Sequence, residues 1–337
     1  MSRRLFSRAL APALVVVCAG AAPVRADPTR SAGAPERFQF HDPIVFHNIT
    51  LVPVSTEEVG PFERYTLLEE GLKKKSLRVR ELAGNSDQAQ VSAVQVRNTG
   101  PLAAFVLSGE MILGGKQDRI LSNDTVIPND GKWHQVEVFC VEQGRWQGRK
   151  MQFEGGAALA HAKLRKAAMS GSQGEVWAEV ERKNAVHGTS SETQTYRRTV
   201  QNAELRRRVA SHRQELVRQL PDARLSGFVF AVNDEVRVAD MFTNPLLFAD
   251  LQEKLLSAYI LEALEQQAPP PSQRAKAGKG FDKAKARAFY EDAKAAPQVG
   301  NKTSGDAVTF KKKKKGMVGT ETKDKVGRTL KESYLAE

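Results

Sequence analysis

Two stretches of the chain place carboxylate, glycine and guanidinium groups where apolar, strand-like runs end. The first runs from Gly109 to Arg119 and reads GEMILGGKQDR, and the second runs from Cys140 to Trp146 and reads CVEQGRW. Glycine permits a positive φ and a close backbone approach to a ligand. Arginine binds a carboxylate or phosphate through two parallel hydrogen bonds, and an indole ring stacks on planar or cationic groups. These residue types predict a polar ligand site at the ends of strands.

We expect the two stretches to meet in space and to form one site. Glu110 and Glu142 are the candidate catalytic pair, because glycosidic bonds are hydrolysed by two carboxyl groups about 5 to 9.5 Å apart. The same groups also suit a purely structural ion-pair cluster at the end of a sheet, and the sequence leaves that alternative open. The candidate ligand-binding residues are Gly114, Gly115, Lys116, Gln117, Arg119, Gln143, Arg145 and Trp146.

Other catalytic templates do not fit this chain. The first stretch is no phosphate-binding loop, because Gly115 precedes the lysine and Gln117 follows it. No two of the six histidines have HxH or HExxH spacing, so we predict neither a metal site nor a cofactor. The strand pattern Val136, Val138, Cys140 places the thiol on an apolar face, where it is a core residue and not a nucleophile.

Strand-like and helical patterns alternate in blocks along the chain. Such an order favours an α+β fold, mainly antiparallel, with helices packed on one side of the sheet. Strands are expected over 44–54, 77–82, 91–98, 103–107, 125–127, 135–142, 226–232 and 236–242, with a further pair within 308–334. Helices are expected over 65–72, 157–168, 175–184, 197–220, 281–295 and from Pro245 to Leu264.

The charge is concentrated at the two ends of the chain. The formal net charge is +12, of which residues 1–26 contribute +4 and residues 272–337 contribute +9, so the part between them carries −1. The near-neutral body argues against general nucleic-acid binding. The run Lys311–Lys315 is read as solvated, with polyanion or membrane-surface contact as the alternative.

The first 26 residues have the pattern of a cleavable signal peptide. Arg3, Arg4 and Arg8 precede an apolar run over 9–22, and Ala26 ends a Val-Arg-Ala sequence that a signal peptidase can cut. We therefore predict cleavage before Asp27 and a periplasmic or secreted protein. A lipid anchor through Cys18 is the weaker alternative.

The stretches GEMILGGKQDR, CVEQGRW, EVWAEV and the long run from Phe228 to Leu264 together resemble the ARG and rhodanese-phosphatase-superfamily-associated protein domain, a bacterial family of unassigned activity. The resemblance covers about residues 38–265. It implies an association with ADP-ribosylglycohydrolases and phosphatases, and hence with ADP-ribose or related metabolites, but no mechanism.

These observations divide the chain into a signal peptide (1–26), a flexible N-terminus (27–37), one α+β domain (38–265), a linker (266–280) and a basic C-terminal extension (281–337). The leading hypothesis is an exported domain that binds a small anionic or sugar-phosphate-like ligand. The alternatives are a hydrolase of glycosidic or phosphate bonds that uses Glu110 and Glu142, and an interaction protein without a ligand. Whether the protein is an enzyme, and its oligomeric state, are left open.

Overall fold

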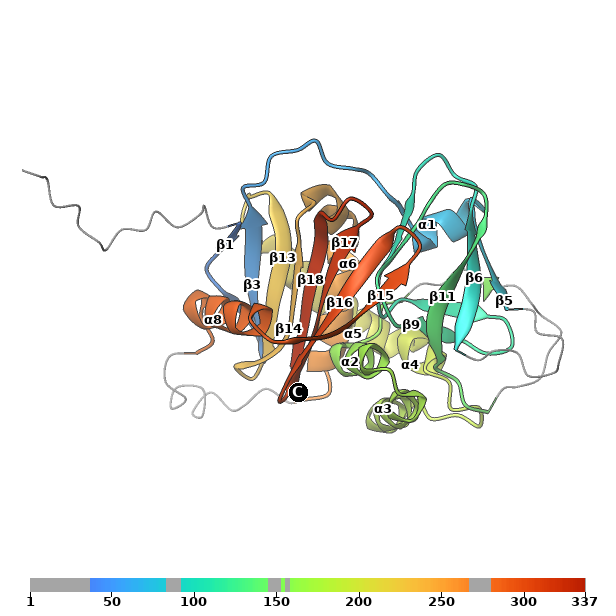
Figure 1. The fold of residues 1–337 in the computed structure, drawn as a ribbon. Helices are drawn as coiled ribbons and strands as arrows, with labels where there is room; N and C mark the ends of the chain where they lie inside the picture. The colour runs from blue at the N-terminus through green and yellow to red at the C-terminus, as the bar shows by residue number, and fades with distance from the viewer. Residues whose placement is uncertain (1–36, 83–91, 145–152, 155–157, 267–279, 337) are drawn as a thin grey trace, which may run out of the picture. The chain divides into compact units, whose positions relative to one another are not determined.

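A nine-stranded antiparallel sheet is the largest part of the fold (Figure 1). The structure is a computed structural model that describes residues 37–82, 92–144, 153–154, 158–266 and 280–336. The central path of the sheet follows the order β1 (Phe38–Phe40), β3 (Ile49–Thr56), β13 (Leu225–Val232), β14 (Glu235–Phe242), β18 (Thr329–Ala336), β17 (Met317–Asp324), β16 (Ala307–Lys314) and β15 (Gln298–Ser304). The ninth strand, β2 (Ile44–Phe46), pairs with β3.

The C-terminal segment is part of this sheet. Figure 1 shows β18, coloured red, between β14 and β17. Residues 298–336 form four strands where the sequence predicted two, and β18 pairs with β14 over five residues. Residues 298–336 therefore complete the main sheet, and the described part of the segment 281–337, which was predicted to be a separate basic extension, belongs to the domain.

Each face of the large sheet buries its own apolar cluster, because side chains alternate along a strand. Phe228 and Phe230 of β13 pack on the face covered by α6 (Pro245–Ala263). Val229 and Ala231 lie on the other face, against α8 (Lys283–Lys294). The helices are thus divided between the two faces and do not all lie on one side.

Two smaller sheets contain the remaining strands of the described residues. A six-stranded sheet has the order β12 (Phe153–Glu154), β8 (Met111–Gly114), β9 (Arg119–Leu121), β11 (Trp133–Cys140), β6 (Ala93–Asn98), β5 (Leu77–Glu81). A three-stranded sheet has the order β10 (Thr125–Ile127), β7 (Ala104–Val106), β4 (Thr66–Leu67), and α1 (Leu68–Lys73) follows β4 directly. The β4–β7 pair is parallel, whereas the strand pairs of the other two sheets are antiparallel, so the α+β prediction is confirmed.

Four helices occupy the middle of the chain, namely α2 (Ala162–Ser170), α3 (Gln173–Val186), α4 (Arg197–Gln201) and α5 (Ala203–Arg218). The single helix predicted over 197–220 is wrong, because Asn202 adopts an extended conformation and its side chain caps α5 by accepting from the amide of Leu205. None of the helices in the described part of the chain combines the length and apolar character needed to cross a membrane.

Candidate functional site

The two candidate stretches lie against each other in the six-stranded sheet. β9 begins at Arg119 and pairs antiparallel with the end of β11, so Arg119 stands opposite Cys140. Gly114 and Gly115 make the turn before β9, with φ angles of 115° and 56°. A Cβ on Gly115 would lie 2.5 Å from the ring of Phe153 and 2.7 Å from the Glu81 carboxylate, so this position needs glycine.

Arg119 is fully buried and its guanidinium is held by protein groups. Nη1 donates to Gln117 Oε1 at 3.0 Å and to Cys140 Sγ at 2.6 Å. Nη2 lies 3.4 Å from both carboxylate oxygens of Glu81, a residue that is also fully buried. The charge of Arg119 is therefore compensated inside the protein.

Glu142 belongs to a neighbouring set of contacts around Asp118. Glu142 Oε2 accepts from the amide of Asp118 at 3.3 Å. The Asp118 carboxylate, itself buried, accepts from Arg197 Nε at 2.8 Å and from the amide of Gly114 at 2.9 Å. Arg197 lies in α4, so this group ties the helical block to the end of the sheet.

The other predicted ligand-binding residues have these positions. The amide of Lys116 donates to Glu81 Oε1 at 2.9 Å, and Gln117 Nε2 donates to the carbonyl of Gln143 at 3.4 Å. Gln143 is exposed, and its amide donates to the carbonyl of Thr193. Arg145 and Trp146 lie outside the described residues.

Glu110 contacts Lys254 of α6 and lies apart from the groups around Arg119 and Asp118. Its Oε1 accepts from Lys254 Nζ of α6 at 2.6 Å, and its Oε2 accepts from the amide of Leu107 at 2.9 Å. The side chain of Glu110 is 1% exposed and that of Lys254 is 15% exposed. Burial by itself lowers the pKa of Lys254, but the charges of Glu110 and Glu69 more than offset it and raise the pKa.

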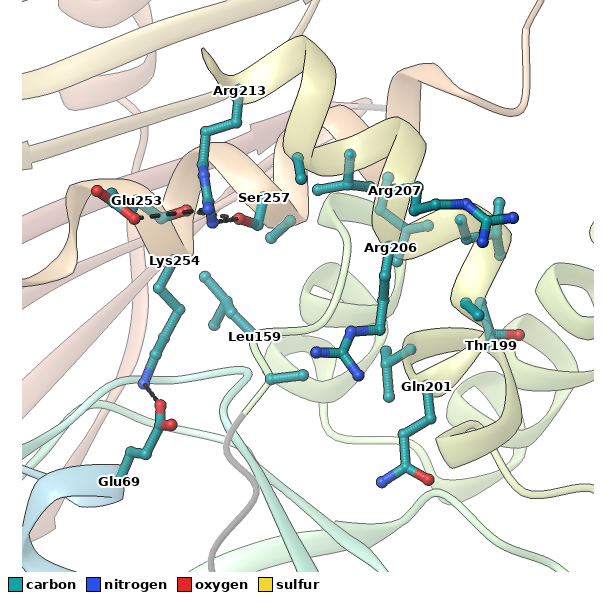
Figure 2. A pocket seen from close by; sticks show the side chains of 18 of the residues that line it. Glu69, Leu159, Thr199, Gln201, Arg206, Arg207, Arg213, Glu253, Lys254 and Ser257 are labelled. Carbon is teal, nitrogen blue, oxygen red and sulfur yellow. Dashed lines mark hydrogen bonds and ion pairs between the residues drawn. The ribbon is translucent and has the colours of Figure 1, made fainter. Parts of the chain in front are cut away.

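Lys254 lines a large cavity between α5 and α6, which we call the α5–α6 cavity. Its volume is about 890 Å³, in the range of about 300 to 1,000 Å³ that is usual for small-molecule sites. Figure 2 shows Lys254 and Glu69 on one side of it, Arg206 and Arg207 on the other, and Leu159 between them. Glu110 thus contacts the wall of this cavity through Lys254, although none of the predicted site residues that the structure describes lines the cavity itself.

The two sides of the α5–α6 cavity differ in how their cations are compensated. Lys254 pairs with Glu110 and lies 3.6 Å from Glu69, and Arg213 donates to Ser257 Oγ at 2.9 Å. The side chains of Arg206 and Arg207 are exposed and have no hydrogen-bond or ion-pair partner among the described residues. Positive charge is therefore available to a ligand at the Arg206 side.

A buried ionic cluster that the sequence analysis did not identify joins α2 to the centre of the large sheet. Arg165 donates to both carboxylate oxygens of Asp240, at 2.8 and 3.1 Å. Lys331 of β18 lies 3.1 Å from Asp124 and 3.5 Å from Asp240. None of these four side chains is more than 1% exposed, so the cluster is a structural connection and no ligand reaches it.

A second cluster has the composition of a metal site but is compensated by the protein itself. Ligand atoms of His161, Glu179 and Glu265 lie within 4.8 Å of one another. Arg182 Nε donates to Glu179 at 2.7 Å and Arg182 Nη1 to Glu265 at 2.9 Å, while Lys183 also pairs with Glu265. A metal ion would compete with these two cations, so we assign none.

The residues that sequence analysis missed left a weak signal. Glu81 ends β5, in which buried and exposed side chains alternate, and it occupies an inward position. A charged residue at an inward position needs a buried partner. The arginines of α5 were visible as a polar helix face, but only the packing of α6 turns part of that face toward a cavity.

The comparisons with known proteins give one result. The model of the ARG and Rhodanese-Phosphatase-superfamily-associated Protein domain matches residues 37–332. No curated protein and no solved structure matches the chain.

Proposed function

The chain belongs to the ARG and Rhodanese-Phosphatase-superfamily-associated Protein domain family, and we propose that it binds a small organic anion in the α5–α6 cavity. The description of the family names no substrate, so the proposal is argued from the geometry of the cavity. We further propose that the protein binds this anion after export, on the strength of the signal-peptide pattern in residues 1–26. Mass spectrometry of the exported form, expected to begin at Asp27, tests the second point.

The observation that carries the proposal is the pair of uncompensated arginines at the cavity. Arg206 and Arg207 have no acidic partner among the described residues, although Glu253 and Asp250 line the same cavity. A guanidinium forms charge-assisted hydrogen bonds to carboxylate or phosphate, and these are about twice as strong as bonds between neutral groups. An anion is therefore the ligand that this wall favours.

The α5–α6 cavity supports anion binding better than the strand ends do. Arg119 has no exposed surface and already contacts Glu81, so an anion there would have to displace a buried carboxylate. Glu110 accepts from Lys254 and from a backbone amide, so its carboxylate is occupied as an acceptor. We therefore favour binding over hydrolysis by Glu110 and Glu142, and Glu110 acts as the support that holds Lys254 at the wall.

The test is a binding titration with a matched pair of arginine variants. A thermal-shift screen of carboxylates, organic phosphates, sugar phosphates and ADP-ribose identifies a probe, since a ligand at 100 times its Kd stabilises the fold by about 2.7 kcal/mol. Calorimetry with that probe is then repeated on Arg206→Ala and Arg208→Ala. Arg208 is exposed on the same helix but does not line the cavity, so it controls for the change in net charge.

We expect Arg206→Ala to weaken binding by about 10- to 100-fold, because it removes hydrogen bonds to a charged group worth about 1.5 to 3 kcal/mol. Arg208→Ala should change the affinity by less than about threefold. Equal losses of affinity in both variants would mean that Arg206 acts only through general electrostatic attraction, which contradicts a site at Arg206. If no anion raised the melting temperature in the screen, the proposal would be overturned.

A further inference from the structure

The walls of the α5–α6 cavity are apolar to an extent that a small hydrophilic anion does not use. Ten of its twenty lining residues are leucine, valine or alanine. Leu113 comes from β8, Val209 from α5 and Leu261 from α6, while Leu159 lies between the two charged sides in Figure 2. The apolar surface is thus contributed by several elements and spans the space between the charged groups.

Among the described residues that line the cavity, the cations without an acidic partner lie on one side. On the opposite side, Lys254 faces Glu110 and Glu69, and Arg213 Nη2 lies 3.7 Å from Glu253. A ligand with several anionic groups distributed along its length would meet these carboxylates. A ligand with one anionic group needs only the Arg206 and Arg207 side.

Resting on the proposed function, we propose that the ligand is an amphipathic anion, with one carboxylate or phosphate group on an apolar acyl or aryl body. The anionic group binds at Arg206, whose guanidinium points toward Leu159 in Figure 2, and the body lies on Leu159, Val209 and Leu261. Sugar hydroxyls placed against these three side chains would lose water without gaining a hydrogen-bond partner from them, which costs about 1 to 3 kcal/mol for each buried group. The volume of about 890 Å³ accommodates a body of this kind.

A chain-length series tests the proposal on the intact protein. The probes are butanoate, hexanoate, octanoate and decanoate, each kept below its micelle concentration, with inorganic phosphate as the hydrophilic anion. A buried methylene contributes about 0.8 kcal/mol, so we expect affinity to rise by two- to fourfold for each added methylene. Phosphate should bind more weakly than octanoate by at least tenfold.

Two valine variants on α5 separate the cavity from the rest of the helix surface. Val209→Gln places an amide in the cavity wall and should flatten the dependence on chain length, whereas Val217→Gln, at a valine that is 40% exposed and outside the cavity, should leave it unchanged. Circular dichroism checks that each variant folds. If Val209→Gln does not fold, the near-isosteric Val209→Thr replaces it and should reduce the gain for each methylene.

The outcomes distinguish this inference from the proposed function. Arg206-dependent binding of phosphate or sugar phosphates, with no effect of chain length, would overturn the amphipathic ligand and leave anion binding standing. No binding of any probe would overturn both. The same anionic group occurs on membrane lipids, so sedimentation with vesicles of phosphatidylglycerol is the remaining arm. Binding to those vesicles without binding to free octanoate would show that the anionic group is recognised on a membrane lipid and not on a free fatty acid.

Discussion

Replacing Asp240 by asparagine removes one negative charge from a cluster that has no contact with solvent. In the native protein the charges of Asp124 and Asp240 balance those of Arg165 and Lys331, and the variant leaves a net charge of +1 in the same space. Asp240 accepts two hydrogen bonds from Arg165 and further bonds from Tyr259 and Ser333. An asparagine keeps one acceptor oxygen but cannot compensate Arg165.

The expected cost follows from the burial of the pair. Arg165 and Asp240 are both 0% exposed at the side chain, so solvent cannot screen the uncompensated guanidinium. Removing one partner of such a pair costs about 3 to 5 kcal/mol. Total unfolding free energies are about 5 to 15 kcal/mol, so Asp240→Asn should lose a large part of the stability of the protein.

The effect has a defined pH dependence. Burial by itself would raise the pKa of Asp240, but the charges of Arg165 and Lys331 more than offset it, so the pKa lies well below its ordinary value. A carboxylate with a lowered folded-state pKa stabilises the protein above its unfolded pKa of about 3.9, and this contribution disappears as the pH falls through the folded value. The difference between wild type and Asp240→Asn should be constant from about pH 5 to 8 and should shrink below about pH 4.

Urea titrations followed by far-UV circular dichroism measure this difference, provided that the slope m is unchanged. Asp42→Asn is the matched control, because Asp42 pairs with Lys283 but its side chain is 84% exposed, and no measurable change is expected. The variant Arg165→Met/Asp240→Leu should recover stability relative to Asp240→Asn, since it leaves no uncompensated charge. A loss below about 1 kcal/mol for Asp240→Asn would refute the reasoning.

Two further predictions concern the strand ends. Glu110→Gln should destabilise the fold by about 1 to 3 kcal/mol at neutral pH, because Lys254 loses its buried partner. The pKa of Lys254 is raised in the folded protein. The loss of stability, measured by urea titration, should therefore persist below the unfolded pKa of about 10.4 and disappear as the pH rises through the folded pKa. Burial raises the pKa of Cys140 to about 11 despite the charge of Arg119. In a Cys18→Ser background at pH 8, the thiol of the folded protein should therefore react with a disulfide reagent at least 100-fold more slowly than the thiol of the protein unfolded in urea. Rapid reaction of the folded protein would contradict this.

The fold class and most of the strands could be predicted from local patterns. The alternation of Val136, Val138 and Cys140 identified β11 and the inward position of the thiol, which is fully buried. The strand predicted over 44–54 was wrong in one respect. It is two strands joined by a turn at His47, where φ is 54°, and Asn48 in that turn donates to carbonyls of Ala263 and Gln266 far along the chain. Contacts at such a separation leave no local pattern.

The candidate site was predicted less completely, for the same physical reason. Residue type indicated that Glu110 and Arg119 need partners, but their partners are Lys254 and Glu81, which lie 144 and 38 residues away. The lysine run 311–315 was read from composition as a solvated surface. In the fold Lys311 donates to the carbonyl of Met169, so part of that run is used for packing, and contact with polyanions stays a prediction.

The position of β18 in the large sheet constrains how a growing polypeptide can acquire its structure. Strands β1, β3, β13 and β14 lie on one side of β18 and strands β17, β16 and β15 lie on the other, so neither group has its central partner until residues 329–336 have been synthesised. The same strand carries Lys331 to the buried cluster with Asp124 and Asp240. Ribosomes add about 5 to 20 residues per second, so a nascent chain passes many seconds without its central strand. We therefore expect the large sheet to be completed only after residues 329–336 have left the ribosome, which would leave the earlier strands open to chaperones until then.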